Sequence, residues 1–288
     1  MKGTYTAIVT PFKNGNIDFD ALKKTIALQK EAGITGLIVA GTTGEAATMT
    51  FEEKEQLFSF VVKNAGDLDL VAGTGTNDTA SSVALTEMAL KAGIEKVLVV
   101  TPYYNKPSCA GLFLHYSEVA ATGAKIVLYN VPGRTALHVA PDCLKKLAEI
   151  ENIIAVKEAS GSVANLIEYQ NAVGADRFDF FSGDDFTVVP FISMGGKGVI
   201  SVFTNVIPKT GVEMINSALN GDFKRAATIQ REILDFNNAM FMETNPLPVK
   251  TAMVIKGLMD ENFRAPLAPM LPENRKRLEE ILKQYNAI

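Results

Sequence analysis

The sequence contains no tryptophan, and only two cysteines and two histidines among its 288 residues. Cys109 and Cys143 are too few for the multi-bridge framework of a small secreted domain, so we expect reduced thiols on core or helix residues. His115 and His138 lie outside any H-E-x-x-H motif or Cys/His cluster. A histidine-rich metal site is therefore excluded, and nothing in the sequence indicates one built from carboxylates alone.

The sequence also lacks a large excess of charge of either sign and long apolar runs. The 28 basic and 32 acidic residues give a net charge of −4, without the block of Lys or Arg that phosphate-backbone binding requires. Apolar runs such as 97–100 are far shorter than the roughly 20 residues of a membrane span, and residues 1–12 lack the apolar core of a signal peptide. We therefore expect a cytoplasmic protein whose partners include neither nucleic acid nor a membrane.

Two common catalytic motifs are absent as well. There is no G-x-S-x-G nucleophile elbow and no G-x-x-x-x-G-K phosphate loop. Residues 73–78 begin like a dinucleotide-binding fingerprint but lack its third glycine, so we interpret them as a turn between a strand and a helix.

Short runs rich in Val and Ile are present, and they alternate with longer amphipathic segments. Continuous rather than alternating hydrophobicity is typical of strands buried on both faces of a parallel sheet. The fold class is therefore α/β. The predicted strands are 5–9, 36–40, 70–74, 96–100, 126–130, 153–157, 178–182 and 198–201.

Helix boundaries between these strands are marked by familiar residues. Asp18 precedes the segment 21–31, Thr50 and Glu53 have the spacing of a capping box, and Pro141 suits a first helical turn. Segments 31–34 and 91–94 are nearly identical, and each places a glycine where a helix ends in the left-handed conformation before a strand. The chain therefore repeats one structural unit.

Eight units of roughly 30 residues each fill a closed (β/α)8 TIM barrel. An open doubly wound sheet is the alternative, but it usually has fewer strands. After residue 201 no further strand is evident, and segments 206–219, 222–240, 246–259 and 272–285 are predicted to be helical. We expect a barrel domain over residues 1–221 and a C-terminal three-helix appendage over 222–288.

A TIM barrel carries its active site on the loops at the carboxyl ends of its strands. In this sequence those positions are strongly polar. They are Thr10, Thr42 to Glu45, Tyr103 to Asn105, Tyr129, Asn130, Arg134, Lys157, Glu158 and Gly183 to Asp185.

Lys157 is the most informative of these residues, because it directly extends the apolar run 153–156. An ammonium group inside a parallel sheet is unfavourable unless it has a task. Burial lowers the pKa of a lysine, and a neutral amine can attack a carbonyl to form a Schiff base. A salt bridge to Glu158 or to an aspartate of the next strand would explain the lysine equally well by position alone.

Neighbouring residues favour the catalytic interpretation of Lys157. Tyr129 on the adjacent strand should face the same cavity and could relay protons, although it could also be a rim aromatic. Thr42 and Thr43 can offer hydroxyl and N–H donors to a carboxylate, or could simply form a turn. Arg134 could clamp a carboxylate with its guanidinium fork, or could be an exposed loop residue.

Five segments in order resemble the dihydrodipicolinate synthase family, part of the pyruvate-dependent class I aldolase superfamily that includes N-acetylneuraminate lyase. The resemblance covers nearly the whole chain, and its motifs are segments 41–45, 101–107, 129–135, 156–159 and 183–185.

The resemblance implies that Lys157 forms a Schiff base with pyruvate, without a metal or an organic cofactor. It implies a proton relay of Tyr129, Thr42 and Tyr104, with Tyr104 supplied by the neighbouring subunit of a homotetramer built as a dimer of dimers. Thr43 would hold the pyruvate carboxylate, with Gly183 and Ile200 lining the pocket. Arg134 would bind L-aspartate 4-semialdehyde, so that the product is 4-hydroxy-tetrahydrodipicolinate on the lysine and diaminopimelate pathway.

Two alternatives remain at this stage. N-acetylneuraminate lyase or another 2-keto-3-deoxy sugar-acid aldolase shares the Schiff base, but the neuraminate lyases lack an arginine at the position of Arg134. A non-catalytic barrel would be expected to have lost Lys157 or Tyr129, and the sequence retains both.

Feedback control is expected to differ from that of lysine-inhibited family members. Those members have two histidines and a glutamate at positions that here match Phe51, Lys54 and Ser81, whereas Tyr103 and Asn77 remain. We therefore expect weak or no inhibition by lysine.

Overall fold

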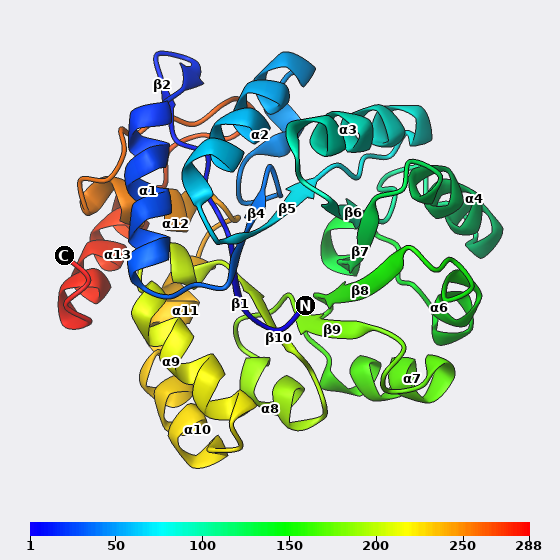
Figure 1. Cartoon of the computed structure of the whole chain (residues 1–288). Coiled ribbons are helices and arrows are strands. Elements are labelled where there is room, and N and C mark those ends of the chain that lie inside the picture. The colour runs from blue at the N-terminus through cyan, green and yellow to red at the C-terminus, as the bar shows by residue number, and fades with distance from the viewer.

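The computed structural model describes all 288 residues, and at its centre eight parallel strands close into a barrel (Figure 1). The strands are β1 (Gly3–Ala7), β4 (Gly36–Val39), β5 (Asp69–Gly73), β6 (Lys96–Val100), β7 (Lys125–Asn130), β8 (Ile153–Glu158), β9 (Asp179–Ser182) and β10 (Gly198–Ser201). They follow one another in chain order around the barrel, which β1 closes by pairing with both β4 and β10. The predicted TIM barrel is confirmed, and each predicted strand lies within about two residues of the observed one.

Helices surround the barrel and connect its strands. They are α1 (Phe19–Glu31), α2 (Phe51–Ala65), α3 (Thr79–Ala92), α4 (Cys109–Ala120), α5 (Pro132–Thr135), α6 (Pro141–Leu147), α7 (Val163–Val173), α8 (Val188–Ser193) and α9 (Pro208–Leu219). Two short 3-10 helices, η1 (Ala46–Thr48) and η2 (Phe203–Asn205), follow β4 and β10. A small hairpin of β2 (Phe12–Lys13) and β3 (Asn16–Ile17), which the hydrophobic pattern does not predict, follows β1.

The predicted helix boundaries are present. Asp18 accepts a hydrogen bond from the N–H of Ala21, with the donor and acceptor 3.0 Å apart. Thr50 and Glu53 form the complete capping box at the start of α2. Gly33 and Gly93 have φ values of 78° and 98°, in the left-handed region where glycine ends a helix without steric cost.

Both faces of the barrel strands are buried, which explains their continuous hydrophobicity. A cluster of 36 buried residues lies mainly between the strands and the helices from α1 to α8, whereas 11 buried residues, among them Tyr129 and Ile200, fill the barrel interior. The interior is therefore a packed core, closed except at the end where the polar loops lie.

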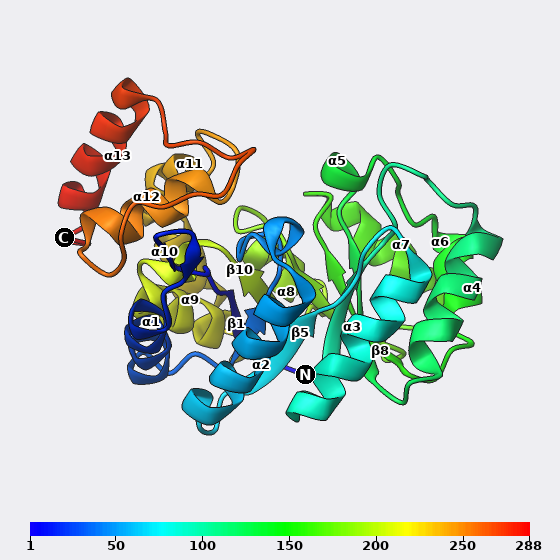
Figure 2. The ribbon, with the colours of Figure 1, turned by 90° about the horizontal axis from the view of Figure 1, so that it is seen from above.

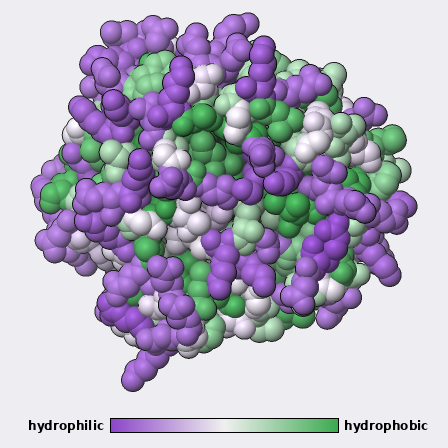
Figure 3. Space-filling view, viewed as in Figure 1, coloured by the Kyte–Doolittle hydropathy of each residue, from purple (hydrophilic) through white to green (hydrophobic).

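The other end of the barrel is shut. The ammonium of Met1 pairs with Asp179 at the beginning of β9. Figure 3 shows this face covered largely by hydrophilic side chains, with small hydrophobic areas between them. Access to the interior is therefore from the carboxyl ends of the strands.

The C-terminal helices pack around a second core of 27 buried residues, which they share with α8, α9 and η2. They are α10 (Phe223–Glu232), α11 (Leu234–Met240), α12 (Leu247–Ile255) and α13 (Pro272–Gln284). The predicted helix 222–240 is divided at Ile233 into α10 and α11, so four helices follow α9 rather than three. Figure 2 shows α11, α12 and α13 standing beside the end of the barrel where α5 lies.

One expectation about the outer helices is wrong. Cys109 and Cys143 were expected to be reduced, but they form a disulfide between the first turns of α4 and α6. These helices pack against each other on the outside of the barrel, which brings the two Cα atoms to 5.5 Å. No helix of the chain combines the length and hydrophobicity needed to cross a lipid bilayer.

Candidate active site

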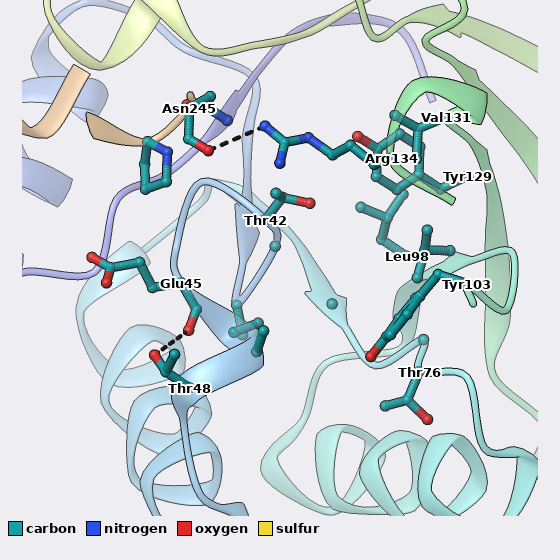
Figure 4. A pocket seen from close by; sticks show the side chains of 18 of the residues that line it. Thr42, Glu45, Thr48, Thr76, Leu98, Tyr103, Tyr129, Val131, Arg134 and Asn245 are labelled. Atoms are coloured by element: carbon teal, nitrogen blue, oxygen red, sulfur yellow. Dashed lines mark hydrogen bonds between the residues drawn. The ribbon is translucent and has the colours of Figure 1, made fainter. Parts of the chain in front are cut away.

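A cavity of about 490 Å³ opens at the carboxyl ends of β4, β5, β6 and β7. Its wall contains Lys54. It also contains Thr42, Thr48, Thr76, Tyr103, Tyr129, Arg134 and Asn245, which are labelled in Figure 4. The structure therefore brings together three of the residues expected to act on substrate, Thr42, Tyr129 and Arg134. No group of three His, Cys, Asp or Glu side chains that could hold a metal ion exists in the chain.

Lys157 is not among the residues that line this cavity; it lies on β8, beside β7, next to the cavity residue Tyr129. Its side chain is only 6% exposed, and its Nζ lies 4.3 Å from the centre of the Tyr129 ring. Tyr129 and Lys157 are partners in the parallel register of the two strands, so both side chains point to the barrel interior. An amine and a phenol are therefore held next to each other by neighbouring strands.

Glu158, the alternative ion-pair partner of Lys157, forms hydrogen bonds with other residues. Successive strand residues point to opposite faces, and the Glu158 carboxylate accepts hydrogen bonds at 2.7 Å from both the Asn130 side chain and the Ser160 N–H. Lys157 takes part in none of the ion pairs of the chain. The salt-bridge explanation of Lys157 is therefore excluded, and its amine is available to a ligand.

Gly183 and Ile200 complete the surroundings of Lys157. A Cβ atom at Gly183 would lie 2.8 Å from Cε of Lys157, so any larger residue would displace the lysine side chain. Ile200 belongs to the interior cluster that also contains Tyr129 and Ile38. Both residues therefore shape the space around the amine rather than offer polar groups to it.

Thr42 and Thr43 form the corner of a tight turn after β4. The N–H groups of Gly44 and Glu45 donate to the carbonyl oxygens of Gly41 and Thr42, each at 3.1 Å. Thr43 is buried, and its Oγ1 accepts a hydrogen bond of 3.0 Å from the Asn245 side chain. The turn thus presents Thr42 to the cavity and fixes the hydroxyl of Thr43.

Arg134 lies on α5, which directly follows β7 and begins with Pro132. Its Nη2 donates to the backbone oxygen of Asn245 at 3.1 Å, which holds the guanidinium across the mouth of the cavity (Figure 4). The remaining donors of the fork are free to bind a carboxylate at the entrance.

Tyr104 is the one predicted site residue that is remote from this group. Its side chain is 90% exposed and contributes nothing to the cavity wall, whereas its neighbour Tyr103 does. Tyr104 also has a φ of 73°, in the left-handed region that non-glycine residues rarely adopt. Within a single chain, Tyr104 therefore does not reach Lys157.

Sequence reasoning missed Asn245, which contacts both Thr43 and Arg134, and Lys250, which pairs with Glu45 of the turn. Asn245 precedes a helix of the C-terminal appendage and is distant in sequence from every barrel strand. No motif or hydrophobic pattern around it indicates a functional role. Lys250 did carry one, because it interrupts the apolar segment 247–255 just as Lys157 extends an apolar strand.

Comparison with known proteins gives one consistent result. The model of the dihydrodipicolinate synthetase family matches residues 1–285. A 4-hydroxy-tetrahydrodipicolinate synthase of Aquifex aeolicus is 43% identical to the chain, over 99% of this chain and 98% of that protein.

Solved structures agree with the sequence comparison. The crystal structure of dihydrodipicolinate synthase from Aquifex aeolicus has a TM-score of 0.97 at 43% identity, covering 100% of this chain and 99% of that one. The chloride-inhibited dihydrodipicolinate synthase from Acinetobacter baumannii complexed with pyruvate has a TM-score of 0.97 at 37% identity, with 100% and 99% of the two chains covered.

Proposed function

The chain belongs to the dihydrodipicolinate synthetase family, and on that basis we propose that Lys157 forms a Schiff base with pyruvate and condenses it with L-aspartate 4-semialdehyde. The activity is that of a 4-hydroxy-tetrahydrodipicolinate synthase, a lyase of lysine and diaminopimelate biosynthesis. The observation that carries this assignment is an unpaired, nearly buried lysine beside a tyrosine that lines a cavity together with an arginine.

The first half of the reaction uses pyruvate. The amine of Lys157 attacks the ketone carbon, and loss of water from the carbinolamine gives the imine. Tyr129 and Thr42 carry protons to and from the forming carbinolamine, and Thr43 holds the pyruvate carboxylate. Gly183 and Ile200 leave room for the methyl group, which loses a proton to give the enamine.

The second half uses the semialdehyde. The enamine carbon attacks the aldehyde to form the new carbon–carbon bond, while Arg134 holds the carboxylate of this substrate. The amino group of the bound product then attacks the imine carbon, which closes the ring and releases Lys157 as the free amine. The second candidate, cleavage of N-acetylneuraminate, shares the first half, but the placement of Arg134 at the cavity mouth favours the semialdehyde.

The decisive experiment traps the imine. The protein is incubated with pyruvate and borohydride, digested, and searched by mass spectrometry for a reduced pyruvyl adduct. We expect the adduct on Lys157, whereas Lys54 and Lys250, two other nearly buried lysines, serve as internal controls that stay unlabelled. Folded protein without an adduct would contradict the mechanism. Turnover of L-aspartate 4-semialdehyde rather than N-acetylneuraminate then separates the two candidate functions.

The assembly belongs to the same proposal. Because Tyr104 is exposed within one chain, its place in the relay requires a second subunit that carries it to the neighbouring cavity. We assign a homotetramer, built as a dimer of dimers, acting in the cytoplasm. Sedimentation velocity at micromolar concentration is expected to give a tetramer, and a monomer with full activity would contradict the shared site.

Weak or absent inhibition by lysine is the last part of the proposal. Lys54 and Tyr103 both contribute to the cavity wall, and Lys54 has a pKa lowered by burial and no carboxylate partner. Ser81, at the position of the missing glutamate, donates its N–H to Asp78 at the start of α3 and supplies no negative charge for an ammonium ligand. Steady-state activity is expected to persist in millimolar L-lysine, and inhibition below one millimolar would contradict this.

A further inference from the structure

Lys250 and Glu45 form an ion pair that is fully enclosed by protein. Lys250 is 0% exposed and Glu45 is 4% exposed. The Lys250 ammonium contacts the Glu45 carboxylate, donates to the backbone oxygen of Asn262 at 3.1 Å, and lies 4.6 Å from the centre of the Phe12 ring. Burial of this kind is expensive for both charges, and a pair of hydrophobic residues would stabilise the fold equally well or better. Fold stability alone therefore gives little reason for the pair.

The pair is attached directly to the turn that carries the substrate threonines. Glu45 has a φ of 56°, a left-handed conformation that costs a non-glycine residue roughly 1 kcal/mol or more. In this conformation its N–H donates to the carbonyl of Thr42, and its carbonyl accepts from the Thr48 hydroxyl, both at 3.1 Å. The side chain of Glu45 is anchored by Lys250 while its backbone closes the turn around Thr42 and Thr43.

A second contact from the same part of the chain reaches the site. Asn245, just before α12, donates to Thr43 Oγ1 and accepts from Arg134 through its backbone oxygen. Arg264 follows α12, and its backbone N–H donates to the second carboxylate oxygen of Glu45 at 3.2 Å. The Arg264 guanidinium donates to the backbone carbonyl of Thr48 at 3.1 Å. Asn245, Lys250 and Arg264 therefore each contact the turn.

We propose that Lys250, acting through Glu45, is a positioning residue that sets the Thr42–Thr43 turn for reaction with pyruvate. This inference rests on the proposed function, because it assumes that these threonines act on the pyruvate imine. It also gives the C-terminal helices a role in catalysis, since α12 supplies the ammonium that holds the turn.

The test removes the charges one at a time and together. Lys250→Met keeps the apolar stem, Glu45→Gln keeps the size and one acceptor oxygen, and the double variant leaves no unpaired charge inside the protein. The double variant guards against misfolding, because loss of both partners is tolerated better than loss of one. Lys256→Met, at the end of the same helix and away from the turn, is the matched control.

We expect kcat to fall about 10- to 100-fold and KM for pyruvate to rise in all three variants, because misplacement by about 1 Å can cost this much. KM for the semialdehyde should stay near that of the parent, since Arg134 is held by Asn245 rather than by Glu45. The effects of the two single changes should not add in the double variant. The control should match the parent.

A purely structural pair predicts a different pattern. The melting temperature would fall, but kcat and both KM values per folded molecule would match the parent, and that result would overturn the inference. Failure of the proposed function is recognised separately, because the parent protein would then give no pyruvyl adduct on Lys157 in the trapping experiment. A parent that is labelled, together with variants of unchanged kcat, would reject only the role of Lys250.

Discussion

At the scale of single residues, the site depends on which face of a strand each side chain occupies. Lys157 and Glu158 are neighbours in sequence, yet one points to the barrel interior and the other is hydrogen-bonded to Asn130 and Ser160 outside it. A shift of one residue in register would have placed a carboxylate beside Tyr129 and turned the amine of Lys157 to the outside of the barrel. The strand alternation therefore fixes the chemistry as firmly as the residue types do.

Tyr129→Phe tests the proton relay. The ring remains beside Lys157, but the hydroxyl that exchanges protons with the carbinolamine is lost, so kcat should fall about 10²- to 10⁴-fold. Tyr103→Phe, which removes a hydroxyl from another part of the cavity wall, is the control and should change kcat only a few-fold. A Tyr129→Phe enzyme with kcat close to that of the parent would remove this tyrosine from the mechanism.

Arg134→Ala tests recognition of the second substrate. Loss of charge-assisted hydrogen bonds costs about 1.5–3 kcal/mol, which corresponds to an increase of roughly 10- to 100-fold in KM for the semialdehyde. Borohydride trapping of pyruvate on Lys157 should be almost unchanged, because Arg134 lies at the cavity mouth. Arg134→Lys keeps the charge but loses the fork of guanidinium donors. Its KM for the semialdehyde should lie between those of the parent and of Arg134→Ala. Semialdehyde kinetics equal to those of the parent would refute this role.

Residues of the site differ in how well the sequence alone predicts them. Thr42, Tyr129 and Arg134 were expected at strand ends, and they line one cavity because a parallel barrel gathers those ends. Asn245 was missed because it reaches Thr43 across 202 residues, from the segment just before α12, which no strand pattern ties to the barrel. Lys250 could have been found by the criterion applied to Lys157, a lysine inside an apolar segment.

At the scale of elements, hydrophobic periodicity and helix-capping residues predicted most of the strands and helix boundaries that depend on local sequence. The strands and the capping box of α2 follow from residues close in the chain, and they match the structure. The break at Ile233 and the Cys109–Cys143 bond were not predictable, because both depend on how helices pack. Helix packing is decided by contacts between distant segments, which a single sequence does not display.

The contact between α3 and α4 predicts how the stability of the fold depends on pH. His115 is buried on α4, its Nδ1 lies 3.0 Å from the Thr79 hydroxyl of α3, and its Nε2 has no partner. Burial lowers the pKa of His115 to about 4, below the value near 6.5 of an unfolded chain. The neutral ring therefore contributes stability that is fully present above pH 6.5 and is lost as the pH falls toward 4.

His115→Gln measures this contribution. His115 binds a proton more readily in the unfolded chain than in the folded parent. The free energy of unfolding of the parent, relative to that of the variant, should therefore fall by on the order of 1 kcal/mol per pH unit below pH 6.5. Urea denaturation at several pH values between 7 and 4 gives the difference. Thr79→Val removes the hydrogen bond but keeps the imidazole, so it should retain the slope of the parent. Parallel curves for parent and His115→Gln would contradict the assignment.

At the scale of the whole molecule, the barrel and the C-terminal helices meet at the turn after β4. The C-terminal segment supplies Asn245 and Lys250 to the turn after β4, so the appendage and the barrel share one site. The sequence predicted these helices but not this contact, since amphipathic patterning shows that a face is buried and not what covers it. The proposed role of Tyr104 would extend this sharing beyond the chain, because Tyr104 is exposed and does not line its own cavity.

Mixing two inactive variants tests whether Tyr104 acts in the cavity of a neighbouring chain. Lys157→Ala lacks the nucleophile but keeps Tyr104, whereas Tyr104→Phe keeps the nucleophile. In a hybrid dimer, the cavity of the Tyr104→Phe chain would receive an intact Tyr104 from its Lys157→Ala partner and would become complete. Random exchange makes about half of the dimers hybrid, each with one complete site of two, so about a quarter of the parental activity should return. If Tyr104 served its own chain, no combination would hold both groups in one cavity, and the mixture would stay as inactive as its parts. Recovery on mixing, measured after co-expression or subunit exchange, therefore distinguishes a site shared between chains from one that each chain completes alone.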